Sequence, residues 1–282
     1  MDLLVSTEWL AARLNQSGVA VVDASAHLPS AGRDPRADFL AGHIPGARYL
    51  DLATLVDETS PVPSALPRPE QLAERLRALG VNQSDHVVLY DDSTLRTSAR
   101  AWMMARTAGL TSVSVLDGGM EKWRAEGRPV ESGESAVAPG DITLSGAAAS
   151  LSRSKEEMLG NCATRAEQVV DARDAGRFTG EVEDTVHGLP GGHIPGAKHL
   201  FFRSLLAEDG TFLPPAQIAA RFAEAGIDLD RPLVASCGSG VTASVVLLGA
   251  ALAGKADAAL YDGSWSEWGA DPATPKETGA AR

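Results

Sequence analysis

The chain has 282 residues, 44% of them hydrophobic, with a formal net charge of −12 and a pI of about 4.9. This is enough for two domains of ordinary size, each with its own core. The acidic balance leaves no basic stripe to neutralise phosphates, so we do not expect a nucleic-acid partner. No hydrophobic run approaches the ~18 residues of a membrane span, so we expect no membrane-embedded part.

The chain contains two cysteines, Cys162 and Cys237, too few for a disulfide scaffold. Its first residues lack the basic flank and apolar stretch of a signal peptide. The six histidines are scattered, without the spacing of a metal site. We therefore expect a cytoplasmic protein, in a reducing compartment that suits a working thiol, with neither a metal nor an organic cofactor.

Both halves of the chain predict the same order of elements. In the first half we expect a helix at 6–14, a buried strand at 19–22, a long loop, a helix at 69–79 closed by Gly80, and strands at 87–90 and 113–116. In the second half we expect a helix that begins at the capping box Ser154–Glu157, a strand at 168–170, a helix at 215–225, a strand at 233–235, a helix at 243–252 and a strand at 258–261. Strands alternating with helices predict an α/β fold, with parallel sheets covered by helices on both faces.

Repeated motifs show that this similarity is a duplication. Gly-His-Ile-Pro-Gly-Ala occurs at 42–47 and again at 192–197, and Val-Val-Asp-Ala occurs at 21–24 and again at 169–172. Two repeats of this length indicate a duplicated domain rather than a solenoid.

We place the two domains at residues 1–130 and 151–282. The linker between them, at 131–150, is rich in Ser, Gly, Ala and Pro and has little to bury.

Cys237 heads a tight turn between a strand and a helix of the second copy. Two glycines in this turn allow backbone angles at which successive N–H groups point inward and form a nest for an anion. The positive end of the following helix adds to this field. We predict that Cys237 is a nucleophile held as a thiolate, and the alternative is a buried structural cysteine. The predicted anion cradle comprises Gly238, Ser239, Gly240, Val241 and Thr242.

The turn Cys-Gly-Ser-Gly-Val-Thr-Ala resembles the active-site loop of rhodanese-like sulfurtransferases, most closely that of 3-mercaptopyruvate sulfurtransferases. Thiosulfate-preferring members typically carry basic residues directly after the cysteine, where this chain has Gly238 and Ser239. With the repeats, the resemblance extends over nearly the whole chain. It implies two tandem rhodanese-like domains and the transfer of a sulfane sulfur through a persulfide on Cys237.

The first copy lacks the features of this turn. Alignment of the repeats places Asp91 opposite Cys237, and the loop that follows, at 92–96, is longer and has no glycine. It offers neither a thiol nor a nest, so we expect the first domain to be catalytically silent. The resemblance implies the same division.

Arg177 opens an Arg-Phe-x-Gly pattern after the first strand of the second copy. In the family this arginine binds the anionic group of the substrate, so the resemblance assigns that role to Arg177. A planar guanidinium suits a carboxylate or thiosulfonate, because it donates two parallel hydrogen bonds. The alternative is a structural ion pair with Asp171 or Glu181, although we expect Arg173 to be the structural partner.

Two departures from the mercaptopyruvate pattern bear on the donor. Those enzymes usually carry a second arginine shortly before the second Gly-His-Ile-Pro-Gly motif, where this chain has none, and His187 is the candidate to replace it. They also commonly carry a histidine and an aspartate in the first domain, where this chain has Ser64 and Ala53. A Ser-His-Asp relay through Ser239 is therefore not available, and thiosulfate stays open as the donor.

Other chemically notable residues are interpreted as structural. His43 and His193 occupy the same context in both copies, so we expect them to fix their turns rather than to bind metal or act as bases. Trp265 and Trp268 are interpreted as packing residues, and Cys162 as a structural cysteine.

The predicted function is a two-step sulfur transfer. Cys237 attacks the outer sulfur of a small anionic donor held by Arg177, either 3-mercaptopyruvate or thiosulfate, and the loop N–H groups stabilise the resulting persulfide. A thioredoxin-like protein, a low-molecular-weight thiol or cyanide then takes the sulfur, and we expect a monomer. A Cys-dependent phosphatase would need an arginine where this chain has Ala243. A non-enzymatic persulfide relay module would hold the sulfur but turn over small donors poorly.

Overall fold

The computed structural model describes residues 2–14, 16–134, 136–147 and 151–281. It divides into two compact units. The first comprises Met1–Asp57, Leu66–Ala148 and Glu208–Phe212, and the second comprises Glu58–Ala65, Ala149–Ala207 and Leu213–Arg282. Part of the predicted linker, residues 135 and 148–150, lies outside the described residues.

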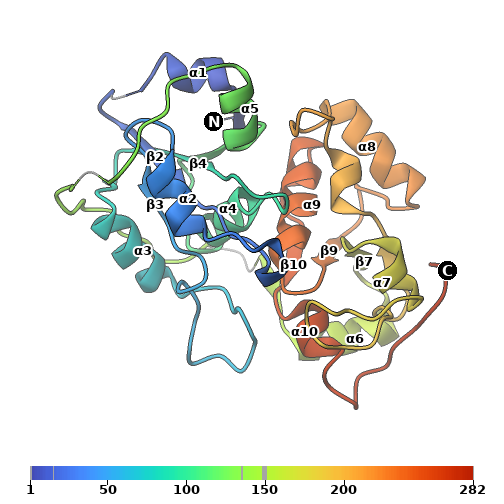
Figure 1. Ribbon diagram of the computed structural model, residues 1–282. Coiled ribbons are helices and arrows are strands. Elements are labelled where there is room, and N and C mark those ends of the chain that lie inside the picture. The colour runs from blue at the N-terminus through green and yellow to red at the C-terminus, as the bar shows by residue number, and fades with distance from the viewer. Residues whose placement is uncertain (1, 15, 135, 148–150, 282) are drawn as a thin grey trace. The chain divides into compact units, whose positions relative to one another are not determined.

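The first unit is built on a five-stranded parallel sheet (Figure 1). Its strands are β1 (Leu4–Val5), β2 (Val19–Asp23), β3 (Arg48–Tyr49), β4 (His86–Tyr90) and β5 (Val113–Leu116). They lie in the order β1-β5-β4-β2-β3. Its helices are α1 (Thr7–Ala11), η1 (Pro29–Ala31), α2 (Pro35–Ala41), α3 (Pro69–Ala78), α4 (Ser98–Thr107) and α5 (Gly119–Ala125).

The second unit repeats this arrangement. Its strands are β6 (Ser152–Arg153), β7 (Gln168–Asp171), β8 (Lys198–His199), β9 (Leu233–Ser236) and β10 (Ala259–Tyr261). The order β6-β10-β9-β7-β8 gives each strand the place of its counterpart in the first sheet. Its helices are α6 (Lys155–Thr164), α7 (Ala175–Thr179), η2 (Phe202–Leu205), α8 (Pro215–Glu224), α9 (Val241–Leu252) and α10 (Ser264–Trp268).

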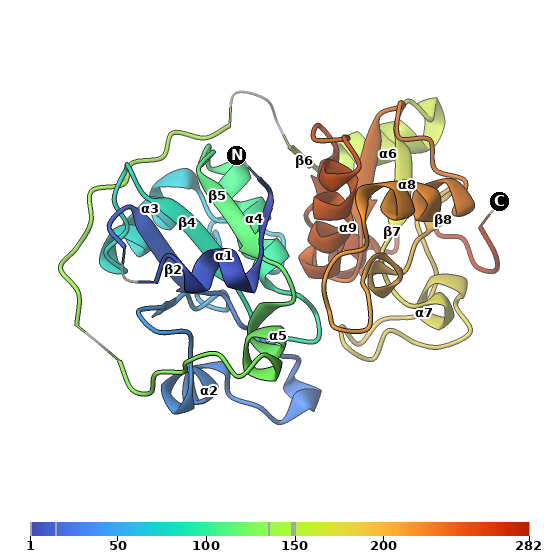
Figure 2. The same ribbon diagram turned by 90° about the horizontal axis from the view of Figure 1, so that it is seen from above.

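Helices lie on both faces of each sheet (Figure 2). In the first unit, Leu10 of α1, Phe39 of α2 and Trp123 of α5 join one core cluster with the strands. The central strands are continuous apolar runs, as expected where both faces of a parallel sheet are buried. The predicted α/β fold with two parallel sheets is therefore confirmed.

The expectation of a long loop before each Gly-His-Ile-Pro-Gly turn was incomplete, because a short helix, α2 or α7, lies there. Each helix has an aspartate N-cap: Asp34 accepts from the Arg36 and Ala37 N–H groups, and Asp174 accepts from the Arg177 N–H group. Helices of one or two turns are too short to show a helical hydrophobic period. The N-cap aspartates are the signal that could have revealed them.

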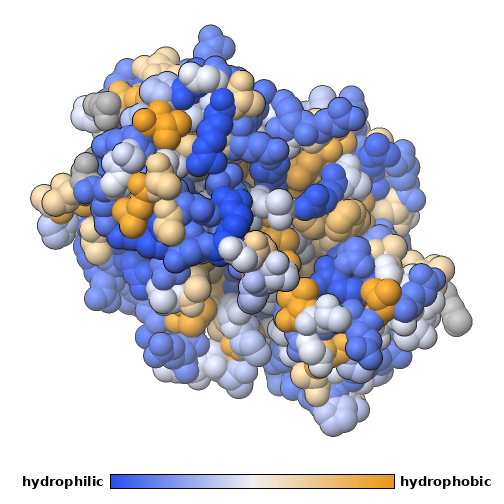
Figure 3. All heavy atoms as spheres, viewed as in Figure 1, coloured by the Kyte–Doolittle hydropathy of each residue, from blue (hydrophilic) through white to orange (hydrophobic). Residues whose placement is uncertain are grey.

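Hydrophilic side chains cover most of the face in Figure 3, with hydrophobic ones in small separate groups. Among the described residues, no helix has the length and apolar content needed to cross a membrane.

Candidate active site

Cys237 lies directly beyond β9, at the carboxyl edge of the second sheet. In the parallel pairing of β7 with β9, Asp171 stands beside Ser236, so the residues that follow both strands emerge at the same edge. In open α/β sheets this edge is where ligands bind. Cys237 itself is 2% exposed.

The backbone of the cysteine turn is fixed from outside. The Cys237 N–H donates to Ser264 Oγ at 3.0 Å. The Cys237 and Gly238 carbonyls accept from the N–H groups of Trp265 (3.0 Å) and Ser266 (2.8 Å). Because both carbonyls point toward this neighbouring segment, the turn is held in one conformation before any ligand arrives.

Ser264 holds an uncommon backbone conformation to make its contact. Its φ is 50°, in the left-handed region that non-glycine residues rarely occupy. Its hydroxyl donates to the Tyr261 carbonyl at 2.8 Å while accepting from Cys237. The equivalent position in the first unit is Gly119, with a φ of 57°. Sequence reasoning missed Ser264, and its place opposite Gly119 in the repeat was the available signal.

The N–H groups that follow Cys237 in the turn are open. Within the described part of the chain, the N–H groups of residues 238–242 donate to no protein acceptor. Gly240 has a φ of 76° and is the N-cap of α9, whose first N–H groups have no partner within the helix. This backbone can therefore accept an anion beside the Cys237 sulfur.

The equivalent loop of the first unit is filled by its own side chain. One carboxyl oxygen of Asp91 accepts from the Ser93 N–H at 2.9 Å. The other accepts from both the N–H (2.9 Å) and the hydroxyl of Ser98. Burial raises the pKa of Asp91, against the lowering effect of these hydrogen bonds. In the first loop an aspartate therefore stands in place of the thiol, and its carboxylate occupies the Ser93 and Ser98 donors.

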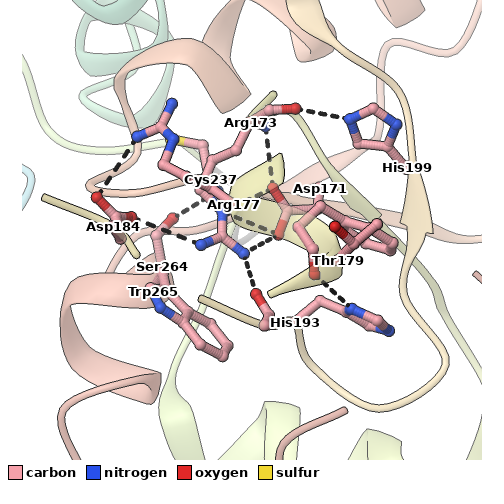
Figure 4. A network of polar contacts seen from close by, with 12 residues as sticks. Asp171, Arg173, Arg177, Thr179, Asp184, His193, His199, Cys237, Ser264 and Trp265 are labelled. Atoms are coloured by element: carbon pink, nitrogen blue, oxygen red, sulfur yellow. Dashed lines mark hydrogen bonds and ion pairs between the residues drawn. The ribbon is translucent and has the colours of Figure 1, made fainter. Parts of the chain in front are cut away.

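A buried arginine lies within the site (Figure 4). Arg173 is 1% exposed, and its Nη2 atom donates to Asp171 and to the Gly192 carbonyl, both at 2.6 Å. Its guanidinium stacks on Trp265 at 4.6 Å. Burial acts to lower the pKa of Arg173, but the charges of Asp171, Asp184 and Cys237 together raise it. The expected structural ion pair between Arg173 and Asp171 is thus present. The charge of the Arg173 guanidinium also interacts with Cys237.

Arg177 forms ion pairs with Asp174 (2.6 Å) and Asp184 (3.5 Å). These partners differ from Asp171 and Glu181, the pairings expected for a structural role. Its side chain stays 23% exposed and lines a shallow pocket. The Arg177 guanidinium is therefore oriented by two carboxylates and is still accessible to a ligand.

Asp184 joins the two arginines to His187. It is fully buried, lies 3.5 Å from Arg173 and from Arg177, and its Oδ1 is 2.9 Å from His187 Nδ1. Burial alone would raise the pKa of Asp184, but the His187 hydrogen bond and the three positive partners lower it to about 2. Asp184 was not among the residues predicted from the sequence, since an aspartate in a polar loop carries no distinctive pattern.

His187 lies directly on the cysteine turn. A methyl carbon placed on Gly238 would be 2.2 Å from His187 Cε1 and 3.0 Å from each ring nitrogen. The imidazole therefore occupies the space above Gly238, one residue from Cys237.

The residues that carry Asp184 and His187 have no counterpart in the first unit. His43 lies four positions after Phe39, whose carbonyl it contacts, whereas His193 lies fifteen positions after Phe178. The second copy therefore holds eleven additional residues here, 181–191, which we call the insert. His43 and His193 are both buried and stacked on Phe39 and Phe178, as structural residues would be.

Comparison with known proteins places this chain in a family. A model of the rhodanese-like domain matches residues 6–126 and 154–271. The 3-mercaptopyruvate sulfurtransferase of Mus musculus is 42% identical over 94% of this chain and 91% of its own length. The thiosulfate sulfurtransferase of Cricetulus griseus is 40% identical, with the same coverage of each chain. This chain belongs to the rhodanese-like family.

A solved structure supports the same relationship. The crystal structure of SseA from Escherichia coli, a 3-mercaptopyruvate sulfotransferase, superposes with a TM-score of 0.84 at 36% identity. The match covers 94% of this chain and 99% of SseA. The two tandem rhodanese-like domains inferred from the sequence are thus confirmed.

The remaining residues that were predicted to be structural belong to the core of the second unit. Trp265 and Trp268 are buried in the core of the second unit, and their indole N–H groups donate to backbone carbonyls. Cys162 packs at the edge of the same core, and burial raises the pKa of its thiol. Among the described residues, no cluster of three or more His, Cys, Asp or Glu side chains could hold a metal ion.

Proposed function

We propose that this protein is a 3-mercaptopyruvate sulfurtransferase in which Cys237 carries the sulfur. The open anion cradle around Cys237 supports this most strongly, because its counterpart in the first unit is occupied by Asp91. The relatives named for this activity are similar over nearly the whole chain. Residues 151–282 would form the catalytic domain, and residues 1–130 the silent one.

In the first step, the Cys237 thiolate attacks the sulfur of 3-mercaptopyruvate and forms an S–S bond. The C–S bond breaks, and its electron pair leaves with the carbon as the enolate of pyruvate. The donor thiol proton ends on that carbon, so pyruvate departs and a persulfide anion stays on Cys237. The N–H groups of residues 238–242 stabilise this anion, and Arg177 binds the donor carboxylate.

In the second step, a nucleophilic acceptor attacks the outer sulfur, the S–S bond breaks, and the Cys237 thiolate is released. A thioredoxin-like protein, a low-molecular-weight thiol or cyanide would serve as acceptor. A monomer in the reducing cytoplasm suits this chemistry, since the thiolate is the working form of the cysteine.

Steady-state sulfur transfer in wild type and Cys237→Ser tests the proposal. Wild type should release pyruvate from 3-mercaptopyruvate and carry a persulfide when no acceptor is present, whereas Cys237→Ser should do neither. Cys162→Ser is the matched control and should keep wild-type activity, because Cys162 lies at the edge of the core. Turnover that survives in Cys237→Ser would contradict the mechanism.

Thiosulfate is the second candidate donor. The insert carries no arginine to clamp a carboxylate together with Arg177, and the position next to His187 is the 44% exposed Val186. Thiosulfate transfer releases sulfite and needs no proton, so it makes fewer demands on the site. A higher kcat/KM with thiosulfate than with 3-mercaptopyruvate would favour this donor. A persulfide on Cys237 without turnover of either donor would indicate a relay module.

A further inference from the structure

We infer that His187, oriented by Asp184, moves the proton that 3-mercaptopyruvate must transfer from its thiol to the leaving enolate. This inference rests on the proposed function. It assigns to the insert an acid–base role at the Cys237 site.

The His187 imidazole is held in the orientation of a general acid–base. Its Nδ1 atom faces the buried Asp184 carboxylate at 2.9 Å, which fixes the proton on Nδ1. Within the described part of the chain, the Nδ1 contact with Asp184 is the only hydrogen bond of the ring. Nε2 is thus free to exchange a proton with a substrate.

The insert is ordered by its own contacts and does not depend on a ligand. The N–H and carbonyl of Asp184 pair with the carbonyl and N–H of Leu189, at 2.8 and 3.1 Å. The His187 N–H also donates to the Asp184 carbonyl at 3.1 Å. Because Asp184 also pairs with Arg173 and Arg177, the Asp184–His187 pair is anchored to the buried part of the site.

The position of the ring suits proton transfer at the cysteine. The imidazole covers Gly238, and Cys237 is the adjacent residue of the same fixed turn. A donor whose sulfur reaches Cys237 would therefore pass close to His187. The Asp184 carboxylate that bonds the ring also pairs with the Arg173 and Arg177 guanidinium groups. Arg173 in turn interacts electrostatically with Cys237.

Of the two candidate donors, only 3-mercaptopyruvate requires a proton to be moved during sulfur transfer. His187 therefore acts with this donor and not with thiosulfate. With 3-mercaptopyruvate, Nε2 accepts the proton of the donor thiol and delivers it to the carbon that leaves as the enolate. Asp184 stabilises the imidazolium between these two events. Thiosulfate carries no thiol proton and sulfite leaves as an anion, so its transfer passes without proton movement.

The test compares His187→Gln with wild type on both donors. General acid–base catalysis typically contributes about 100-fold or more, so kcat with 3-mercaptopyruvate should fall by about that factor. With thiosulfate, kcat should stay within about threefold, because no proton-transfer step is lost. Added imidazole should restore part of the 3-mercaptopyruvate rate of His187→Ala.

The control is Glu181→Gln, an exposed position of the same insert, which should leave both rates unchanged. An equal loss with both donors in His187→Gln would overturn the inference and indicate a structural or binding role. An unchanged 3-mercaptopyruvate rate would overturn it as well. A wild-type protein that turns over thiosulfate and not 3-mercaptopyruvate would instead contradict the proposed function, and with it the inference.

Discussion

Ser264 is the residue on which the conformation of the cysteine turn depends. Its left-handed backbone directs its hydroxyl to the Cys237 N–H, and this buried amide has no other acceptor among the described residues. Strain of this kind persists where surrounding contacts over-determine it, and it clusters at functional sites. The first unit has glycine at this position and no such hydrogen bond to Asp91.

Two substitutions of Ser264 separate the hydrogen bond from the strain. Ser264→Ala keeps the strained backbone and leaves the Cys237 N–H unpartnered, which should lower the free energy of unfolding by about 1–3 kcal/mol. Ser264→Gly also loses the hydroxyl but relieves about 1 kcal/mol of left-handed strain, so it should be the more stable variant. Urea unfolding midpoints measure the difference. Equal midpoints for the two variants would show that the backbone at Ser264 is not strained.

Individual site residues could be predicted from the sequence where the residue type is rare and chemically specific. Cys237 and Arg177 stand out by type and by motif, and Arg173 was correctly expected to pair with Asp171. Asp184 and Ser264 could not be predicted in the same way, since their roles depend on contacts with distant residues. Aspartate and serine are ordinary loop residues, and only the folded chain distinguishes them.

The insert and the cysteine turn form a contact between two elements that leaves no room for a side chain at Gly238. The turn cannot retreat, because its carbonyls are bound by Trp265 and Ser266. The insert closes tightly on itself as well: a methyl carbon on Gly191 would lie 2.2 Å from the Val182 carbonyl oxygen.

Gly238→Ala tests this contact. The new methyl group would overlap His187, so the imidazole must move, and we expect a loss of about 1–3 kcal/mol in the free energy of unfolding. Changed NMR shifts of the His187 ring protons should accompany the loss. Gly160→Ala on α6 is the control, since a methyl group there meets no atom within 4 Å. An unshifted His187 resonance in Gly238→Ala would contradict the described packing.

Helices and strands with a clear hydrophobic pattern were predictable from the sequence, and elements that exist only through tertiary pairing were not. The α9 helix and the β4 and β9 strands were found close to their observed bounds. The two-residue strands β1, β3, β6 and β8 were missed, because so short a run has no pattern apart from its pairing. The insert is visible once the repeats are aligned, but its position over Gly238 is not.

Across the whole molecule, the two copies treat an equivalent buried aspartate differently. Asp171 in the second unit is paired with Arg173, whereas its counterpart Asp23 faces Ser25. Burial raises the pKa of Asp23 to about 6, against the hydrogen bonds from Ser25 and Tyr90. A raised pKa in the folded state means that stability is greatest when the group is protonated.

The first unit should therefore lose stability as pH rises. The contribution of Asp23 is fully present below pH 3.8 and is lost as pH increases through about 6. The shift of about two units corresponds to roughly 3 kcal/mol. Hydrogen exchange of β2 amides between pH 4 and 7 should show this loss, and Asp23→Asn should remove it. A parallel loss in Asp23→Asn would contradict the assignment, and exposed Asp230→Asn should behave as wild type.

The carboxyl group of Asp91 acts in the first unit as a tethered ligand. A group attached to its own binding site has an effective concentration of about millimolar or higher, and it never diffuses away. A free anion would have to compete with it for the Ser93 and Ser98 donors. Because Asp91 is part of the same loop, its carboxylate keeps the Ser93 and Ser98 donors occupied, and the state in which they are unoccupied is rarely populated.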